Sequence, residues 1–162
     1  MLAAPELPAV SYVMSYFYFR ALAITGLYDK SFPLWSLWKD QVSLHLTTWM
    51  EDMVSKRSDC HAWGAVPLSE FTGHILGVRS IAPGYAKVWI EPSLGHLTWA
   101  EGKVAIPGGE IEVSWNLSSN GVFHLKYHSE QFLDVTFKLP DGTLHHYIHT
   151  GTIQLECKTN HL

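Results

Sequence analysis

The first part of the chain carries apolar residues at helical spacing. A first helix is predicted over residues 10–24, and it ends before Gly26, a residue type that commonly terminates helices. Aromatic side chains are spread around nearly all sides of this helix, so we expect it to pack against more than one neighbouring element. These aromatic residues are Tyr12, Tyr16, Phe17 and Phe19.

Two further helices are predicted before residue 80. One covers residues 31–46, where an apolar stripe recurs at helical spacing. The next runs from about residue 60 or 63 to residue 76, with Asp59 as its N-cap and Gly77 directly after its end. Glu51 therefore falls in the loop between the second and third helices.

From Tyr85 onward the apolar period changes to two, which is typical of β-strands with one buried face. Turn signals such as Pro107-Gly108-Gly109, Ser119-Asn120-Gly121 and Pro140-Asp141-Gly142 separate several of the alternating segments. About seven antiparallel strands at this short spacing favour a β-sandwich. The expected strands are 87–91, 103–106, 110–115, 123–127, 133–137, 145–149 and 152–156.

These patterns predict an α+β chain in which N-terminal α-helices precede an antiparallel β-sandwich. The division is expected at residue 79, with helices over 1–79 and the sandwich over 80–162. Three helices are too few to cover the apolar surface of the first one, so the helical part is interpreted as the end of a larger helical layer.

The composition and charge of the chain argue against some classes of binding partner. With 47% hydrophobic and 13% aromatic residues among 162, the chain can bury a sizeable core. A formal charge of −4 without a basic run argues against nucleic acid and against anionic membranes, which both need clustered Lys and Arg. No window is long enough for a membrane span, and the first residues lack the pattern of a secretory signal. Seven Trp and ten His fit uncharged polar ligands better.

Several residues that could carry chemistry have a plainer interpretation. Cys60 and Cys157 do not form a disulfide framework and are expected to stay free. His145, His146 and His149 do not predict a metal site, because strand alternation places His146 on the opposite face from the other two. No metal and no cofactor is therefore expected. A set of tryptophans in the second half could line a sugar platform, but packing in the strand core is the favoured interpretation. This set is Trp89, Trp99 and Trp115.

The segment around residues 51–63 concentrates the candidate chemistry. The acidic pair Glu51-Asp52 precedes the stretch 57–63, which contains Asp59, His61 and Trp63. A carboxylate that takes a proton from water, an imidazole that binds hydroxyl groups and an aromatic face are what a carbohydrate-cleaving pocket needs. Asp52 is expected to be a surface residue.

Five ordered motifs resemble the α-L-rhamnosidases of glycoside hydrolase family 78, over nearly the whole chain. They are Thr47-Thr48-Trp49-Met50-Glu51; Arg57 to Ala65; Leu76-Gly77-Val78-Arg79; Ile81 to Tyr85 with Ile90-Glu91-Pro92; and Leu97 to Gly102 followed by Pro107 to Ile111.

The resemblance implies a fold and a set of roles. These enzymes hydrolyse terminal α-L-rhamnosides with inversion, using an (α/α)6 barrel backed by a β-sandwich, so the chain would supply the last barrel helices and that sandwich. Glu51 would be the general base that activates water. His61, Trp63 and Trp49 would line the sugar site, and the ligand would be a rhamnose-containing glycoside or polysaccharide.

The resemblance also places the general acid in an earlier part of the barrel, which this sequence does not contain. One carboxylate cannot both activate water and protonate the leaving group, so the isolated chain is expected to be inactive and to depend on the missing part of the barrel. The alternative is a non-catalytic carbohydrate-binding or interaction module.

Overall fold

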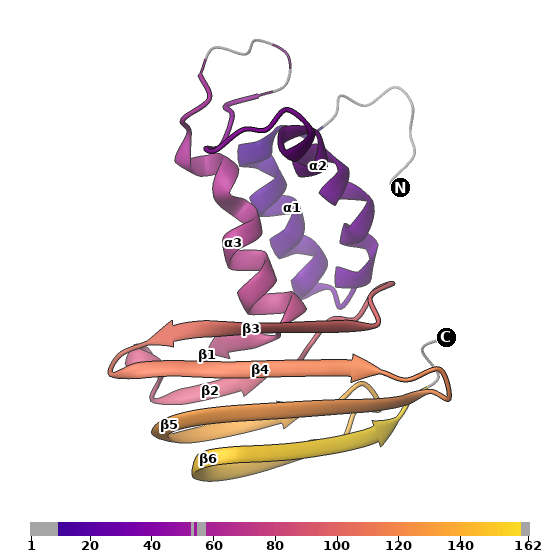
Figure 1. Ribbon diagram of the computed structural model, residues 1–162, viewed down its shortest axis with the longest axis vertical. Helices are drawn as coiled ribbons and strands as arrows, with labels where there is room; N and C mark the ends of the chain where they lie inside the picture. Colours follow the sequence, from indigo (N-terminus) through magenta and orange to yellow (C-terminus); the bar gives the residue numbers. More distant parts are fainter. Residues whose placement is uncertain (1–9, 53, 55–57, 160–162) are drawn as a thin grey trace. The chain divides into compact units, whose positions relative to one another are not determined.

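A computed structural model describes residues 10–52, 54 and 58–159. The chain divides into two compact units, residues 1–67 and residues 68–162. The first contains only helical elements, and the second contains all the strands together with the end of the third helical stretch (Figure 1). This confirms the predicted α+β class. That the boundary between the two domains lies at residue 79 stays a prediction.

The helical unit begins with α1, Tyr12–Ile24, whose first turn is capped where the Ser11 hydroxyl accepts a hydrogen bond from the Met14 amide at 3.4 Å. The expected second helix has two parts: a 3₁₀ segment, η1 (Tyr28–Trp35), and a short α-helix, α2 (Ser36–Ser43). Pro33 lies inside the 3₁₀ segment. Because proline lacks the N–H that an α-helix interior requires, the regular helix starts only after it.

An aromatic cluster forms the core of this unit. The ring centroid of Trp38 lies 5.4 Å from that of Tyr12 and 5.6 Å from that of Trp35, and Phe19 packs 4.8 Å from Trp35. The Tyr12 hydroxyl donates to the Leu37 carbonyl at 2.9 Å. Burial in this cluster raises the pKa of Tyr12. The Tyr12 hydroxyl thus has a hydrogen-bond partner inside an otherwise apolar core.

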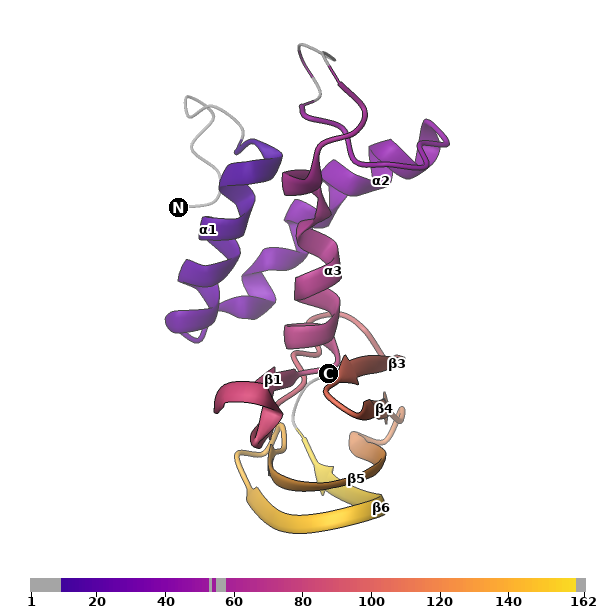
Figure 2. The same ribbon diagram turned by 90° about the vertical axis from the view of Figure 1, so that its left-hand side faces the viewer.

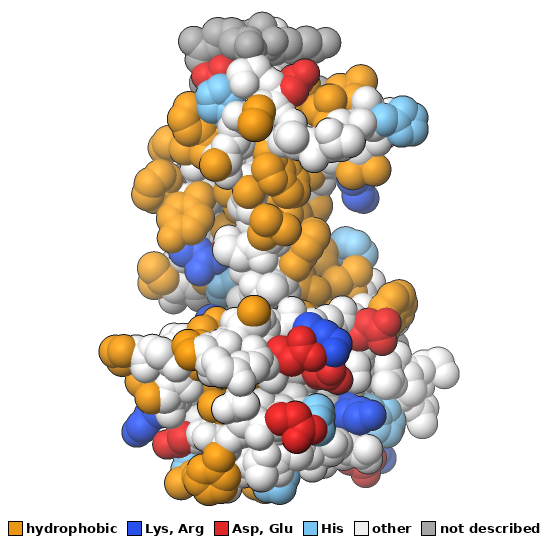
Figure 3. Space-filling model, turned by 60° about the vertical axis from the view of Figure 1, so that its left-hand side comes forward, with side chains coloured by type: hydrophobic (Ala, Val, Ile, Leu, Met, Phe, Trp, Pro, Cys, Tyr) orange, Lys and Arg blue, Asp and Glu red, His pale blue; other side chains and the backbone are white. Residues whose placement is uncertain are grey.

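The opposite side of α1 stays uncovered. Met14, Phe17 and Ile24 are 54%, 59% and 86% exposed, and orange apolar side chains gather over the helical elements in Figure 3. The apolar surface of α1 is therefore larger than the described residues of this unit can cover.

The third helical stretch contains three short segments: η2 (Ala62–Ala65, 3₁₀), α3 (Val66–Glu70) and the π-helical η3 (Phe71–Ile75). The predicted N-cap at Asp59 is wrong. His61 occupies the cap position, with extended backbone and no side-chain cap hydrogen bond. The Asp59 carbonyl instead accepts a hydrogen bond from the Thr48 hydroxyl.

The second unit contains one six-stranded sheet in the order β1-β2-β5-β4-β3, with β6 paired to β5. A 3₁₀ turn, η4 (Pro83–Tyr85), connects β1 to β2. Every pairing is antiparallel except that of β2 with β5, which is parallel. The strands are β1 (Val78–Ser80), β2 (Lys87–Ile90), β3 (Trp99–Ile106), β4 (Gly109–Leu117), β5 (Val122–Lys138) and β6 (Leu144–Lys158).

The long strand β5 folds this sheet into two layers. Its first part pairs with β4 and its last part with β2, while β6 follows it along both parts. A bulge between Ser129 and Leu133 interrupts the register at the bend. Figure 2 shows both strands curving around the end of the sandwich. Four of the expected short strands are therefore joined in pairs, and the three-residue β1 is an addition that the sequence pattern did not indicate.

The core lies between the two layers, where the alternating residues of the strands face inward. Tyr127 and Phe137, one on each side of the bend in β5, meet edge to face with centroids 5.4 Å apart. The fully buried side chains also include Trp115, Phe123, Ile90, Ile111, Leu125, Val88, Val113 and Val135. None of the helices among the described residues has the length and apolar character needed to cross a bilayer.

The entry into the sheet needs a close backbone approach. Gly77 has φ +81°, and a Cβ at this position would lie 2.3–2.4 Å from backbone atoms of Glu91 and Pro92. The Glu91 amide donates to the Gly77 carbonyl at 3.0 Å. Nearby, the buried Trp115 indole donates to the Ile75 carbonyl at 2.8 Å, which ties η3 to β4. At residue 77 only glycine can adopt the positive φ and also leave room for the backbone of Glu91 and Pro92.

A charged cluster around Glu91 joins three strands. One carboxylate oxygen accepts from Arg79 at 2.5 Å and from the Trp89 indole at 2.9 Å, and the other lies 2.7 Å from Lys138. Burial opposes ionisation of Glu91, but hydrogen bonds from Lys138, Trp89 and Arg79 hold its pKa below the usual value. Two of the motifs that resemble rhamnosidases therefore meet in a structural contact.

Candidate functional site

The segment that carries Glu51 is held by its backbone. The His61 amide donates to the Trp49 carbonyl at 2.7 Å, and the Glu51 amide donates to the Ser58 carbonyl at 2.9 Å. These two bonds bring the residues before and after the loop side by side. Residues 49–51 and 58–61 therefore face each other although six residues lie between Glu51 and Ser58 along the chain.

Two buried contacts fix this arrangement from the helical side. The Gln41 side-chain oxygen accepts from the amide of buried Met50 at 3.0 Å, and the Trp38 indole donates to the Gly64 carbonyl at 2.7 Å. Sequence reasoning missed the positioning role of Gln41 and Trp38, because nothing in an apolar helical stripe signals which polar group reaches a distant backbone.

Gly64 lets the start of η2 lie directly against the loop. A Cβ on this residue would lie 2.8 Å from the Cβ of Trp49 and 3.1 Å from the Met50 carbonyl oxygen. Larger residues would push these two segments apart, so the closeness of the Glu51 and His61 segments depends on a missing side chain.

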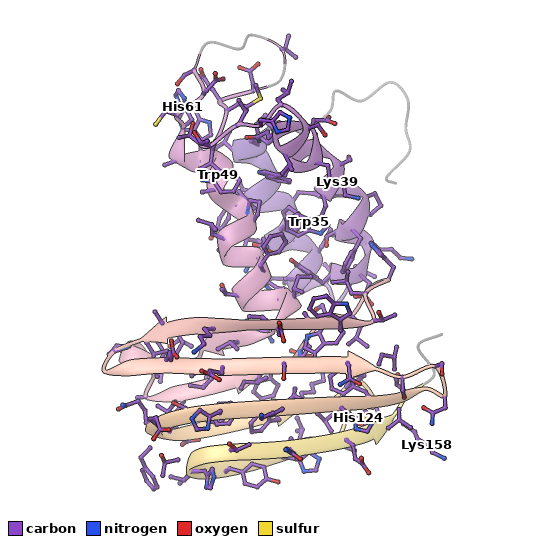
Figure 4. All side chains as sticks on the ribbon, in the orientation of Figure 1. Trp35, Lys39, Trp49, His61, His124 and Lys158 are labelled. Carbon is purple, nitrogen blue, oxygen red and sulfur yellow. The ribbon has the colours of Figure 1, made fainter. Side chains whose placement is uncertain are left out.

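The structure brings three of the four predicted site residues together. The Glu51 carboxylate and the His61 Nε2 lie 4.0 Å apart, and their side chains are 12% and 26% exposed. The His61 and Trp63 rings lie 4.4 Å apart and are tilted by 40°. Trp63 is 45% exposed and Trp49 is half-buried. Figure 4 labels His61 and Trp49 in this upper part of the chain.

This geometry suits proton transfer from a small molecule. At 4.0 Å the carboxylate and the imidazole are too far apart for a direct hydrogen bond, but one water or hydroxyl group can contact both. The Nδ1 of His61 is buried and has no hydrogen-bond partner within the described part of the chain. The exposed indole of Trp63 beside it offers an apolar surface.

Other predicted residues around the loop have structural contacts. Asp52 accepts from the Val54 amide at 2.7 Å, a local turn contact, and Cys60 is a free, exposed thiol. Arg57, the first residue of the second motif, lies outside the described residues.

The histidines of β6 do not converge. His145 and His149 are half-buried, whereas His146 is exposed on the other face and contacts the Asp134 carboxylate at 2.8 Å. Among the residues that the structure describes, no group of three or more His, Cys, Asp or Glu is arranged to hold a metal ion.

The three tryptophans of the strand region have three different environments. Trp115 is 2% exposed in the core, as expected, and Trp89 donates to Glu91. Trp99 is 62% exposed, so the prediction of core packing is wrong for this residue. It is the first residue of the edge strand β3 and pairs with the exposed Asn116, which places both on the outer face of the sheet.

Comparison with known proteins finds similar proteins both by sequence and by fold. The family described as the bacterial alpha-L-rhamnosidase C-terminal domain matches residues 77–145. An alpha-L-rhamnosidase of Alteromonas sp. (strain LOR) is 30% identical over 105 residues, which are 59% of this chain and 11% of that protein.

Solved structures extend the match into the helices. The crystal structure of a GH78 family rhamnosidase of Bacillus sp. GL1 superposes with a TM-score of 0.72 and 35% identity, covering 82% of this chain and 15% of that one. The Streptomyces avermitilis alpha-L-rhamnosidase, solved in complex with L-rhamnose, shares the fold with a TM-score of 0.76 at 18% identity, over 91% of this chain and 18% of that one.

The chain thus spans between about a tenth and a fifth of the length of these relatives. The matches cover both the helical segment and the strands, and they agree with the motifs found in the sequence. In sequence and in fold the chain is similar to the C-terminal portion of α-L-rhamnosidases, including one of family GH78.

Proposed function

We propose that the chain supplies the water-activating half of a site that hydrolyses terminal α-L-rhamnosides with inversion. In this proposal Glu51 is the general base, His61 binds a sugar hydroxyl group, and Trp63 and Trp49 form apolar walls. The observation that carries the proposal is the pairing of a largely buried carboxylate with an imidazole 4.0 Å away, beside an exposed indole.

Each group has a physical task. A carboxylate that is only 12% exposed presents one defined direction to an incoming water, which helps to place that water for attack. The His61 ring is held by its backbone bond to Trp49 and by contact with Trp63, so its Nε2 points toward the carboxylate. The C–H face of a sugar can pack on the exposed part of Trp63.

Inversion needs a second carboxyl group roughly 6.5–9.5 Å from the first, protonated so that it can release the alcohol. In this proposal that acid belongs to the part of a rhamnosidase that the chain does not span. The isolated chain is therefore inactive, because the loss of general-acid assistance alone costs on the order of 10²–10⁴-fold in rate.

The experiment has two arms. The chain alone is incubated with an aryl α-L-rhamnoside, and no release of the phenol is expected. Turnover by the chain alone that Glu51→Gln abolishes would overturn the inactivity. In the second arm, the chain is joined to the preceding barrel region of a rhamnosidase, and the expected effect of Glu51→Gln is a fall in kcat of about 10²–10⁴-fold.

The matched control is Glu130→Gln, which changes the same group at a site that is 85% exposed on the sandwich. This control is expected to leave kcat unchanged. An equal loss in both variants, or no loss with Glu51→Gln, would show that Glu51 is not the base.

A further inference from the structure

The outer face of the sandwich carries polar side chains in rows that cross the strands. Residues paired directly across antiparallel strands point to the same side of the sheet. One row contains Lys103, Glu112, His128 and Thr152, and the next contains Glu101, Ser114, Lys126 and Gln154. His124, labelled in Figure 4, belongs to the third row, together with Trp99 and Asn116.

The first row is satisfied internally. Lys103 lies 2.6 Å from Glu110 and also pairs with Glu112, and these contacts raise the pKa of the Lys103 amine. The His128 ring lies 3.0 Å from the Thr152 hydroxyl and 2.9 Å from Glu130. These side chains already have the partners that their charges require.

The second row differs. Within the part of the chain that the structure describes, the side chains of Glu101, Ser114, Lys126 and Gln154 make no hydrogen bond or ion pair with one another or with other residues. Among the described residues, the Asn116 side chain in the third row likewise makes no such contact. Acceptors and donors therefore stand next to one another on adjacent strands, about 4.8 Å apart, and are open to an external ligand.

A groove of about 420 Å³ lies over β3, β4 and β5. Its lining combines Glu101, Ser114 and Lys126 of the second row with Lys103, Glu112 and His128 of the first row. Trp99 lies two residues before Glu101 on the same face of β3, with 62% of its surface exposed. In Figure 3, acidic, basic and histidine side chains lie next to one another on the surface of the strand region.

We infer that this outer face of β3, β4, β5 and β6 binds a neutral oligosaccharide. The indole of Trp99 stacks on the C–H face of one sugar ring, and Glu101, Ser114, Lys126 and Asn116 hydrogen-bond the hydroxyl groups of the next rings. The charges on this face favour a neutral ligand. The Glu101 carboxylate repels a polyanion and the Lys126 amine repels a polycation, whereas sugar hydroxyl groups can hydrogen-bond to both side chains.

This binding does not use Glu51, so it goes beyond the proposed hydrolysis. The test is an NMR titration of the ¹⁵N-labelled chain with cellohexaose, maltohexaose and xylohexaose, with polygalacturonate as the anionic comparison. At least one neutral probe is expected to shift the Trp99 indole N–H resonance with a millimolar dissociation constant. Trp99→Ala is expected to weaken this binding about tenfold, which corresponds to the loss of one stacking contact.

Phe132→Ala is the matched control, because Phe132 is also an exposed aromatic of the sandwich, at 72%, but lies at the bulge of β5. Neither this variant nor Glu51→Gln is expected to change the affinity, and the second one separates this site from the catalytic proposal. The inference is overturned if no neutral probe shifts the Trp99 resonance at millimolar concentration, if Trp99→Ala binds as well as the parent, or if only polygalacturonate binds.

Discussion

Replacing Gly77 by alanine tests whether the close approach to Glu91 controls the stability of the strand unit. The new Cβ would lie 2.3–2.4 Å from backbone atoms of Glu91 and Pro92, where ordinary contacts begin about 1 Å further out. The neighbouring backbone must therefore move, which breaks the 3.0 Å bond from the Glu91 amide to the Gly77 carbonyl.

The magnitude has two parts that can be separated. Alanine at positive φ costs roughly 1–2 kcal/mol in any position. The displaced backbone adds the lost hydrogen bond and disturbs the contacts of Glu91, so we expect a total on the order of 4 kcal/mol for Gly77→Ala. Gly142 provides the comparison, since its φ is +87° and a Cβ there has no atom within 4 Å. Gly142→Ala is expected to cost only the first part.

Hydrogen–deuterium exchange of peptides from β4 and β5 measures the difference in stability between the two variants. Exchange in these strands reports on the unfolding of the second unit and not on that of the helical unit. Protection in β4 and β5 should fall far more in Gly77→Ala than in Gly142→Ala. Equal losses in the two variants would show that the cost arises from φ alone and that the contact with Glu91 has no energetic weight.

Two further substitutions address contacts at Glu91 and Gly64. Glu91→Gln removes a carboxylate whose pKa is lowered in the folded state, so the stability it contributes is present above its unfolded-state pKa and is lost as the pH falls through the folded-state value. We expect Glu91→Gln to lower the free energy of unfolding by about 1 kcal/mol at neutral pH, a value discounted because the side chain is partly exposed. This difference should disappear in acid. Urea denaturation over a pH series measures it, and a loss that does not depend on pH would contradict the reasoning. Gly64→Ala is expected to speed hydrogen exchange in residues 49–51 by separating them from η2, whereas Gly73→Ala, with open space at its Cβ, should not.

Much of the secondary structure could be predicted from local pattern. The helix at residues 12–24 and the alternating cores of most strands were indicated by period, because the same face of an element must be buried along its length. Pattern could not show that β5 continues through the bulge at Ser129, since the residues there are compatible with a turn.

The candidate site was only partly readable. The motifs indicated Glu51, His61 and Trp63, but their closeness depends on backbone bonds between residues 49–51 and 58–61 and on the absence of a side chain at Gly64. The expected strand began at residue 103, so it did not include Trp99. Because β3 begins at residue 99, alternation places Trp99 on the same outer face as Glu101 and Lys103.

The sequence by itself determined which residues alternate, which turns break the strands and which motifs carry a carboxylate, an imidazole and an indole, since these depend on near neighbours along the chain. The tertiary structure alone decided which distant groups meet: Glu91 with Lys138 and Glu51 with His61. Such contacts arise from long-range strand pairing and backbone approach, which local periodicity does not encode.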